Sequence, residues 1–215
     1  MSGKKETQNY VGSSKESSIR FDFRREFLRF DKEVFYTSCC SGLKGIDFLV
    51  VDGERLVFLE VKNFHGYEDE YRWRTVPDNN GLKDRKRPPK PKDASLDVEM
   101  IGKVSGTLTA LQGAQTFDKT ELLPLHDNFR AWCERTNIFL EPASTEKPRL
   151  SVVLLLEGAP ESESNKTDMI LQRLEKSLKK KLKWLNCLVY VVDLNGAAER
   201  PAISRLFDAT LLPNA

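Results

Sequence analysis

The chain has 215 residues with 34 basic and 32 acidic side chains, so its formal net charge is only +2. A protein that binds nucleic acid through bulk positive charge is far more basic, so any such binding must come from local clusters of Lys and Arg. With only two histidines, Cys2His2 zinc sites and His-pair metalloprotease motifs are excluded, and no apolar run approaches the ~20 residues of a membrane span.

The length and cysteine usage indicate one domain in a reducing compartment. A chain of 215 residues is expected to form a single hydrophobic core. Its four cysteines form no CxxC pair, and its first residues lack the apolar core of a secretory signal. We therefore expect an intracellular, cytoplasmic protein with no membrane association.

The first third of the chain is predicted to contain a tail, a helix and a hairpin. Residues 1–17 are polar and are predicted to be a disordered tail, followed by one domain over 18–215. Apolar residues recur at helical spacing over 19–35, which predicts a helix. Two β-rich runs, 45–51 and 56–63, lie on either side of an Asp-Gly pair, which is a strong hairpin signal.

The remaining elements alternate between helices and strands. Aromatic and β-branched residues alternate with arginines over 71–76, which predicts a third strand, and a basic loop is expected at about 77–97. Later elements are predicted as a helix at 98–117, a short helix at 126–135, a strand at 149–158, a leucine-striped helix at 166–185, a strand at 186–196 and a short helix near 200–210. Two late strands joined by a helix favour an α/β sandwich with a mixed central sheet.

Three charged residues stand out in the otherwise apolar hairpin: Asp47, Glu60 and Lys62. If Asp52-Gly53 are the two turn residues, Asp47 is a diagonal neighbour of Glu60; if the loop takes residues 52–55, Asp47 lies directly opposite Glu60. Both registers put the three side chains on one face, because side chains alternate along a strand. The Cβ atoms of Asp47 and Glu60 are then about 5 Å apart when opposed, or about 7–8 Å when diagonal.

Two converging carboxylates repel each other, so they favour a hard divalent cation, and an oxygen-only set suits Mg²⁺ or Mn²⁺ better than zinc. Such a cation would polarise a phosphoryl oxygen and activate water. Lys62 would orient that water or neutralise charge on the phosphate. The alternative is a cross-strand salt bridge without catalysis. Three charges converging among Val, Leu and Phe favour the functional interpretation, since unpaired buried charge is costly.

The pattern Asp47, then Glu60-Val61-Lys62 on the next strand, resembles the PD-(D/E)xK nuclease superfamily, whose fold is called restriction-endonuclease-like. Ile46-Asp47, Glu60 to Asn63, Gly66 and Trp73 are similar to the nuclease-related subgroup. The resemblance implies an α/β/α sandwich with the order αβββαβ plus an extra helix and strand. It also implies that Asp47, Glu60 and the Val61 backbone carbonyl bind the metal, and that Lys62 is the catalytic lysine.

The family also implies a glutamate from the first helix. Glu26 and Glu33 both border the apolar stripe of the predicted helix, and both are candidates. The Arg-Arg-Glu-Phe-Leu context of Glu26 better resembles the family, so Glu26 is chosen as the fourth catalytic residue.

The run KDRKRPPKPK lies in the predicted loop and is a candidate nucleic-acid clamp, because phosphate binding requires charge but no fixed structure. Its basic residues are Lys83, Arg85, Lys86, Arg87, Lys90 and Lys92. The alternative is a solvated, extended loop without a ligand.

These features together predict a Mg²⁺- or Mn²⁺-dependent endonuclease that hydrolyses DNA and, by the family resemblance, leaves 5′-phosphates. One alternative is an inactive nucleic-acid-binding or scaffolding module on the same fold. A second is an effector subunit of a defence or DNA-processing system, targeted by a protein partner. The family resemblance also allows a homodimer.

Overall fold

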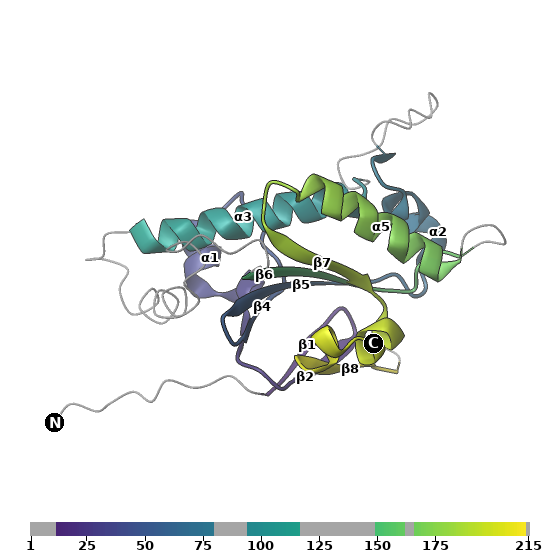
Figure 1. Cartoon of the computed structure of the whole chain (residues 1–215), viewed down its shortest axis with the longest axis horizontal. Coiled ribbons are helices and arrows are strands. Elements are labelled where there is room, and N and C mark those ends of the chain that lie inside the picture. The colour runs from purple at the N-terminus through teal and green to yellow at the C-terminus, as the bar shows by residue number, and fades with distance from the viewer. Residues whose placement is uncertain (1–11, 80–93, 117–148, 162–165, 214–215) are drawn as a thin grey trace.

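The structure is a computed structural model, and it describes residues 12–79, 94–116, 149–161 and 166–213 (Figure 1). Its helices and strands are, in chain order, β1 (Ser13–Glu16), β2 (Ile19–Phe23), β3 (Phe27–Arg29), η1 (Phe30–Lys32), α1 (Val34–Cys39), β4 (Phe48–Asp52), β5 (Arg55–Asn63), α2 (Glu68–Tyr71), η2 (Arg72–Thr75), α3 (Leu96–Thr116), β6 (Leu150–Glu157), α5 (Thr167–Lys181), β7 (Cys187–Val192), α6 (Leu194–Glu199), α7 (Pro201–Ser204) and β8 (Phe207–Leu211).

A five-stranded mixed sheet with the order β3-β4-β5-β6-β7 forms the centre of the fold. The first three strands are antiparallel neighbours, whereas β6 runs parallel to β5 and β7 parallel to β6. Parallel neighbours require long crossover connections, and α3 and α5 lie in these two connections. β6 is buried along nearly its whole length, as its continuous apolar sequence predicts. The predicted mixed α/β class is confirmed.

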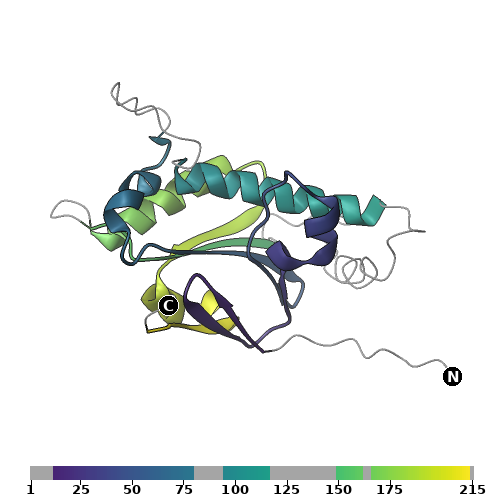
Figure 2. The ribbon, with the colours of Figure 1, turned by 180° about the vertical axis from the view of Figure 1, so that it is seen from behind.

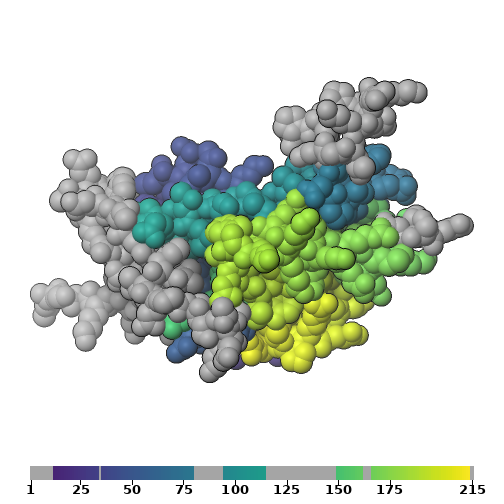
Figure 3. Space-filling model, turned by 45° about the horizontal axis from the view of Figure 1, so that its top comes forward, coloured from purple at the N-terminus to yellow at the C-terminus, as the bar shows by residue number. Residues whose placement is uncertain are grey.

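One face of the sheet is covered by α3 and α5, which run side by side over it (Figures 1 and 3). The leucine stripe of α5 faces this layer, with Leu171, Leu174 and Leu178 buried. They pack with Phe58, Leu154 and other sheet residues in one hydrophobic cluster. The predicted helices at 98–117 and 166–185 and the predicted strands at 149–158 and 186–196 are thus confirmed, with somewhat different ends.

The other face of the sheet is covered by a small antiparallel sheet, β1-β2-β8, and by α6 and α7 (Figure 2). Phenylalanine rings fill the space between the two sheets: Phe21 and Phe23 of β2 contact Phe48 of β4 and Phe207 of β8. This layer differs from the predicted α/β/α sandwich, because a three-stranded sheet and two short helices replace a helical layer.

Two expectations for the N-terminal region are wrong. Residues 19–35 form two strands, a 3-10 turn and the start of α1 in place of one helix, and Ser13–Glu16 form a strand inside the predicted disordered tail. In β2, buried and exposed residues alternate, so the effective period is two. Phe23 pairs with Phe207 across the small sheet, a non-local contact that outweighs the local helical spacing.

The predicted third strand at 71–76 is also wrong, because α2 and η2 occupy this region. The third strand of the antiparallel part is β3, which pairs with β4 from upstream in the chain. At the C-terminus, the predicted helix near 200–210 is limited to α7, and β8 follows it. The predicted helix at 126–135 lies outside the described residues.

The hairpin β4–β5 is confirmed. Asp52 pairs with Arg55, so the turn residues are Gly53 and Glu54, and Gly53 has a positive φ of 62°. This register is the one in which Asp47 lies opposite Glu60. Among the helices that the structure describes, none combines the length and the apolar character of a membrane span.

Candidate active site

The hairpin brings two carboxylates together at the end of β4. Phe48 pairs with Leu59, so the next position places Asp47 opposite Glu60. At this point β4 no longer bonds to β5, and the Val61 N–H instead donates to Asp47 Oδ2 at 2.8 Å. The bond fixes the Asp47 carboxylate against β5. Asp47 is 7% exposed and Glu60 is 0% exposed.

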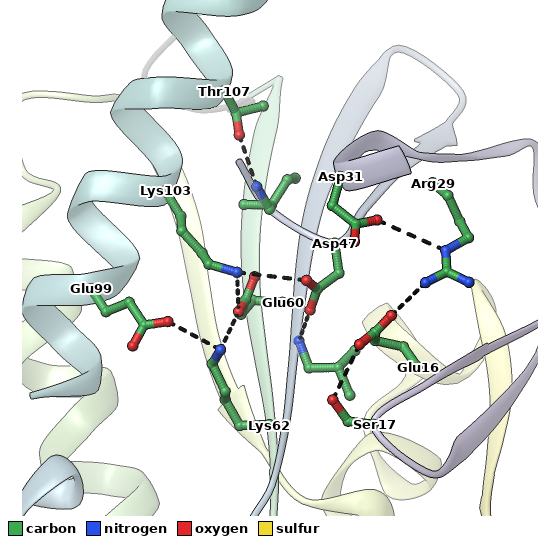
Figure 4. Close-up of polar contacts among 12 residues, drawn as sticks. Glu16, Ser17, Arg29, Asp31, Asp47, Glu60, Lys62, Glu99, Lys103 and Thr107 are labelled. Atoms are coloured by element: carbon green, nitrogen blue, oxygen red, sulfur yellow. Dashed lines mark hydrogen bonds and ion pairs between the residues drawn. The ribbon is translucent and has the colours of Figure 1, made fainter. Parts of the chain in front are cut away.

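Lys62 lies two residues beyond Glu60 on the same face of β5, and its Nζ is 2.8 Å from Glu60 Oε1 (Figure 4). The structure therefore brings together Asp47, Glu60 and Lys62. The Val61 N–H points past the end of β4, and its carbonyl leaves β5 on the same side, because both groups of one strand residue point the same way. This direction is the one that a metal ligand at Val61 would need.

Helix α3 adds two charged residues that the sequence analysis did not identify. Lys103 Nζ lies 2.6 Å from Glu60 Oε1 and 3.6 Å from Asp47 Oδ1. One turn earlier, Glu99 Oε1 lies 3.0 Å from Lys62 Nζ (Figure 4). The other oxygen of Glu99 pairs with Arg74. The available signal was the i, i+4 spacing of Glu99 and Lys103, which puts both on one helix face.

The segment that leads into β4 docks tightly against α3 just beyond Lys103. The Ile46 N–H donates to Thr107 Oγ1 at 3.1 Å, and both residues are buried. A Cβ at Gly106 would lie 2.1 Å from the Lys44 carbonyl oxygen, so only glycine permits this approach. These contacts hold Lys103 above Asp47.

In this cluster, burial disfavours the charged form of each group, whereas neighbouring groups of opposite charge favour it. Burial and the neighbouring Asp47 carboxylate raise the pKa of Glu60 to about 7, against the attraction of Lys62 and Lys103. Burial opposes the charged form of Lys62, but Glu60 and Glu99 outweigh it and raise the Lys62 pKa. Burial likewise opposes the charged form of Glu99, yet Lys62 and Arg74 outweigh it and lower the Glu99 pKa. The raised pKa keeps the Lys62 side chain an ammonium at neutral pH.

The pKa of Glu60 predicts a pH-dependent stability. A carboxyl whose folded pKa is raised contributes stability below its unfolded pKa of 4.5, and this contribution is lost as the pH rises through about 7. We expect Glu60→Gln to match the wild type near pH 5 and to exceed its free energy of unfolding at pH 8 by roughly 3 kcal/mol. Urea unfolding at the two pH values measures this difference.

Glu99→Gln is the matched comparison, because the Glu99 pKa is lowered. Its ion pairs contribute stability above the unfolded pKa and lose it as the pH falls, so Glu99→Gln is expected to be less stable than the wild type at pH 8. If the free energies of unfolding of Glu60→Gln and the wild type differed by the same amount at both pH values, this result would contradict the raised pKa of Glu60.

The donor set fits a hard divalent cation in its chemistry. Asp47 and Glu60 supply carboxylate oxygens, and Glu60 Oε2 is a buried acceptor without a hydrogen-bond partner among the described residues. Within the same part of the chain, no group of three or more His, Cys, Asp and Glu side chains is arranged to hold a metal. The cation that contacts both carboxylates is the ammonium of Lys103.

The predicted helix glutamate is not at the site. Glu26 lies in the turn between β2 and β3, and its carbonyl accepts from the Val51 N–H. Val51 is near the hairpin turn, four residues from Asp47, which corresponds to about 13 Å along a strand. Assigning Glu26 to the site is therefore wrong, because it followed from a helix that does not form. Glu33, the other candidate, is the residue that precedes α1.

The six basic residues of the candidate clamp, Lys83, Arg85, Lys86, Arg87, Lys90 and Lys92, lie outside the described residues. A model of one protein family, described as a family of unknown function (DUF6661), matches residues 29–207 of the chain. This range contains every residue of the charged cluster. No curated protein and no solved structure matches the chain.

Proposed function

We propose that the chain, which belongs to the DUF6661 family, is a Mg²⁺- or Mn²⁺-dependent nuclease that hydrolyses DNA. Asp47 and Glu60 would hold the cation, and Lys62 would be the catalytic lysine. The observation that carries this proposal is the Glu60 carboxylate: it is fully buried beside Asp47 and Lys62, and one of its oxygens has no hydrogen-bond partner among the described residues. A fold does not bury such a charge for stability, because a well-packed apolar residue would stabilise it as well or better.

The arrangement of strands supports a restriction-endonuclease-like fold. The antiparallel strands β3, β4 and β5 are followed by α3 and the parallel strand β6, which corresponds to the βββαβ part of the order expected from the PD-(D/E)xK resemblance. Asp47 immediately precedes the second of these strands, and Glu60 and Lys62 lie on the third, the positions that the resemblance implies. The first helix of that order has no counterpart before β3 among the described residues.

Each residue has a distinct task in this proposal. Asp47 and Glu60 bind the cation with carboxylate oxygens, and the Val61 carbonyl faces the same side. When bound, the cation supplies Lewis-acid activation of the phosphoryl group and of water. The Val61 N–H holds the Asp47 carboxylate in place. Lys62 donates a hydrogen bond to the attacking water or to the phosphate, and it stabilises the negative charge that develops there.

The direct test is cleavage of supercoiled plasmid and of a single-stranded DNA in Mg²⁺ or Mn²⁺. We expect Asp47→Asn to reduce cleavage by at least about 100-fold, since it removes the negative charge of a ligand but preserves side-chain shape. Asp168→Asn, at an exposed acid in the first turn of α5, should cleave like the wild type. Equal cleavage by wild type and Asp47→Asn would show that the activity comes from another site.

A second candidate function follows from the ion pairs of the same cluster. Asp47, Glu60 and Glu99 are matched by Lys62, Lys103 and Arg74, so the cluster with Glu60 ionised is neutral without a metal. This balance favours a nucleic-acid-binding or scaffolding module without catalysis. Such a module would bind DNA equally well in EDTA, and Mn²⁺ would not raise its melting temperature.

A further inference from the structure

We propose that the ammonium of Lys103 is the internal counter-ion of the Asp47–Glu60 pair and that a divalent cation binds between these carboxylates by displacing it. This inference rests on the proposed function, because it specifies how the nuclease site is loaded with metal. It assigns a new role to a residue of α3 that lies 43 positions from Glu60 in the sequence.

The contacts of Lys103 distinguish it from the other cations of the cluster. Its Nζ is 2.6 Å from Glu60 Oε1 and 3.6 Å from Asp47 Oδ1. Lys62 pairs with Glu60 and Glu99, and Arg74 pairs with Glu99. Among the cations that the structure describes, Lys103 is therefore the one paired with both carboxylates of the expected metal site (Figure 4).

Charge repulsion favours a cation that displaces the Lys103 ammonium over a cation that binds beside it. A bound Mg²⁺ lies about 2.1 Å from its oxygen ligands. Beside the same two carboxylates it would lie within a few ångströms of the Lys103 ammonium, in a buried region where like charges interact strongly. With all three carboxylates ionised and Lys103 in place the cluster is neutral, so an added divalent cation would leave two uncompensated positive charges there.

The burial of the site points the same way. The Glu60 side chain is 0% exposed, and the Lys103 side chain, whose ammonium contacts the Glu60 carboxylate, is 15% exposed. The four-carbon stem of lysine is flexible and can carry its ammonium to solvent. Helix α3 need not move, because Gly106 and Thr107 hold it against the segment that enters β4. We therefore infer a side-chain displacement on a fixed backbone.

The test is isothermal titration with Mn²⁺ alone, which measures binding without relying on catalysis. We expect Lys103→Met to bind Mn²⁺ at least about 10-fold more tightly than the wild type, because the competing charge is removed. Lys62→Met is the matched control: it removes the other ammonium on Glu60 Oε1, but no ion pair joins Lys62 to Asp47 among the described contacts. The gain in affinity for Lys62→Met should be clearly smaller.

The outcomes separate this inference from the proposed function. If the wild type binds Mn²⁺ and Lys103→Met binds it no more tightly, the displacement of Lys103 is refuted. The proposal of a metal-dependent nuclease is then retained. If only Lys103→Met binds Mn²⁺, Lys103 is a counter-ion that the cation does not displace, so both the displacement and the metal dependence of the wild type are wrong. If neither binds Mn²⁺, both the displacement and the metal dependence are wrong. Should Lys103→Met fail to fold in circular dichroism, Lys103→Gln, which keeps a polar side chain, replaces it with the same expected direction.

Discussion

Lys62→Met is expected to reduce metal-dependent DNA cleavage by about 100- to 1000-fold while leaving Mn²⁺ binding intact. In the proposed mechanism Lys62 is a cation that stabilises charge in the transition state, and removing a single such donor has an effect of this size. Because its pKa is raised by Glu60 and Glu99, it remains charged throughout the neutral and mildly alkaline range. Cleavage rates with saturating Mn²⁺, together with a titration of Mn²⁺, check both parts.

The ion pairs around Lys62 make this variant informative. Without Lys62, Glu60 keeps Lys103 and Glu99 keeps Arg74, so no carboxylate of the cluster loses its last cation. Lys180→Met, at an exposed lysine of α5, is the matched control and should cleave DNA normally. Loss of both cleavage and Mn²⁺ binding in Lys62→Met would assign Lys62 to the integrity of the site and remove its catalytic role.

Gly106→Ala is expected to lower the free energy of unfolding by about 3 kcal/mol, although alanine is normally preferred over glycine inside a helix. The added Cβ would lie 2.1 Å from the Lys44 carbonyl oxygen, an atom of the backbone that cannot rotate away as a side chain does. The helix and the segment entering β4 must then separate, which also strains the hydrogen bond from Ile46 to Thr107. Urea unfolding with circular dichroism measures the change.

Gly102→Ala provides the control in the same helix. A Cβ at Gly102 would meet only the Lys44 side chain at 3.9 Å, an ordinary contact. We therefore expect Gly102→Ala to stabilise the protein by about 0.5–1 kcal/mol, as helix propensity alone predicts. If both variants are stabilised equally, α3 does not approach Lys44 as closely as described, and the position of Lys103 above Asp47 loses its structural support.

The two stability effects bear on function because α3 is the element that completes the site. Glu99 and Lys103 contact the charged residues of the hairpin only if α3 keeps its position relative to the sheet. The contacts of Gly106 with Lys44 and of Thr107 with Ile46 determine this position. A helix displaced by a few ångströms would leave Glu60 buried without Lys103, which is costly for an ionised carboxylate.

The sequence by itself determined the hairpin and the alignment of its charges. The turn at Gly53, the β-rich runs beside it and the alternation of side chains are local properties, so Asp47, Glu60 and Lys62 could be assigned to one face before any coordinates were known. The strands β6 and β7 and the helix between them were also predictable, since each carries a strong pattern over its own length.

Only the tertiary structure decided which elements surround the hairpin. The phenylalanines of β2 suit a helix or a strand, and pairing with β8, which lies far along the chain, selects the strand. Similarly, nothing near Glu99 or Lys103 in the sequence indicates their partners, because α3 is positioned by the contact of Gly106 with Lys44, some sixty residues away. Contacts between distant segments depend on the packing of the whole chain, and local patterns do not encode them.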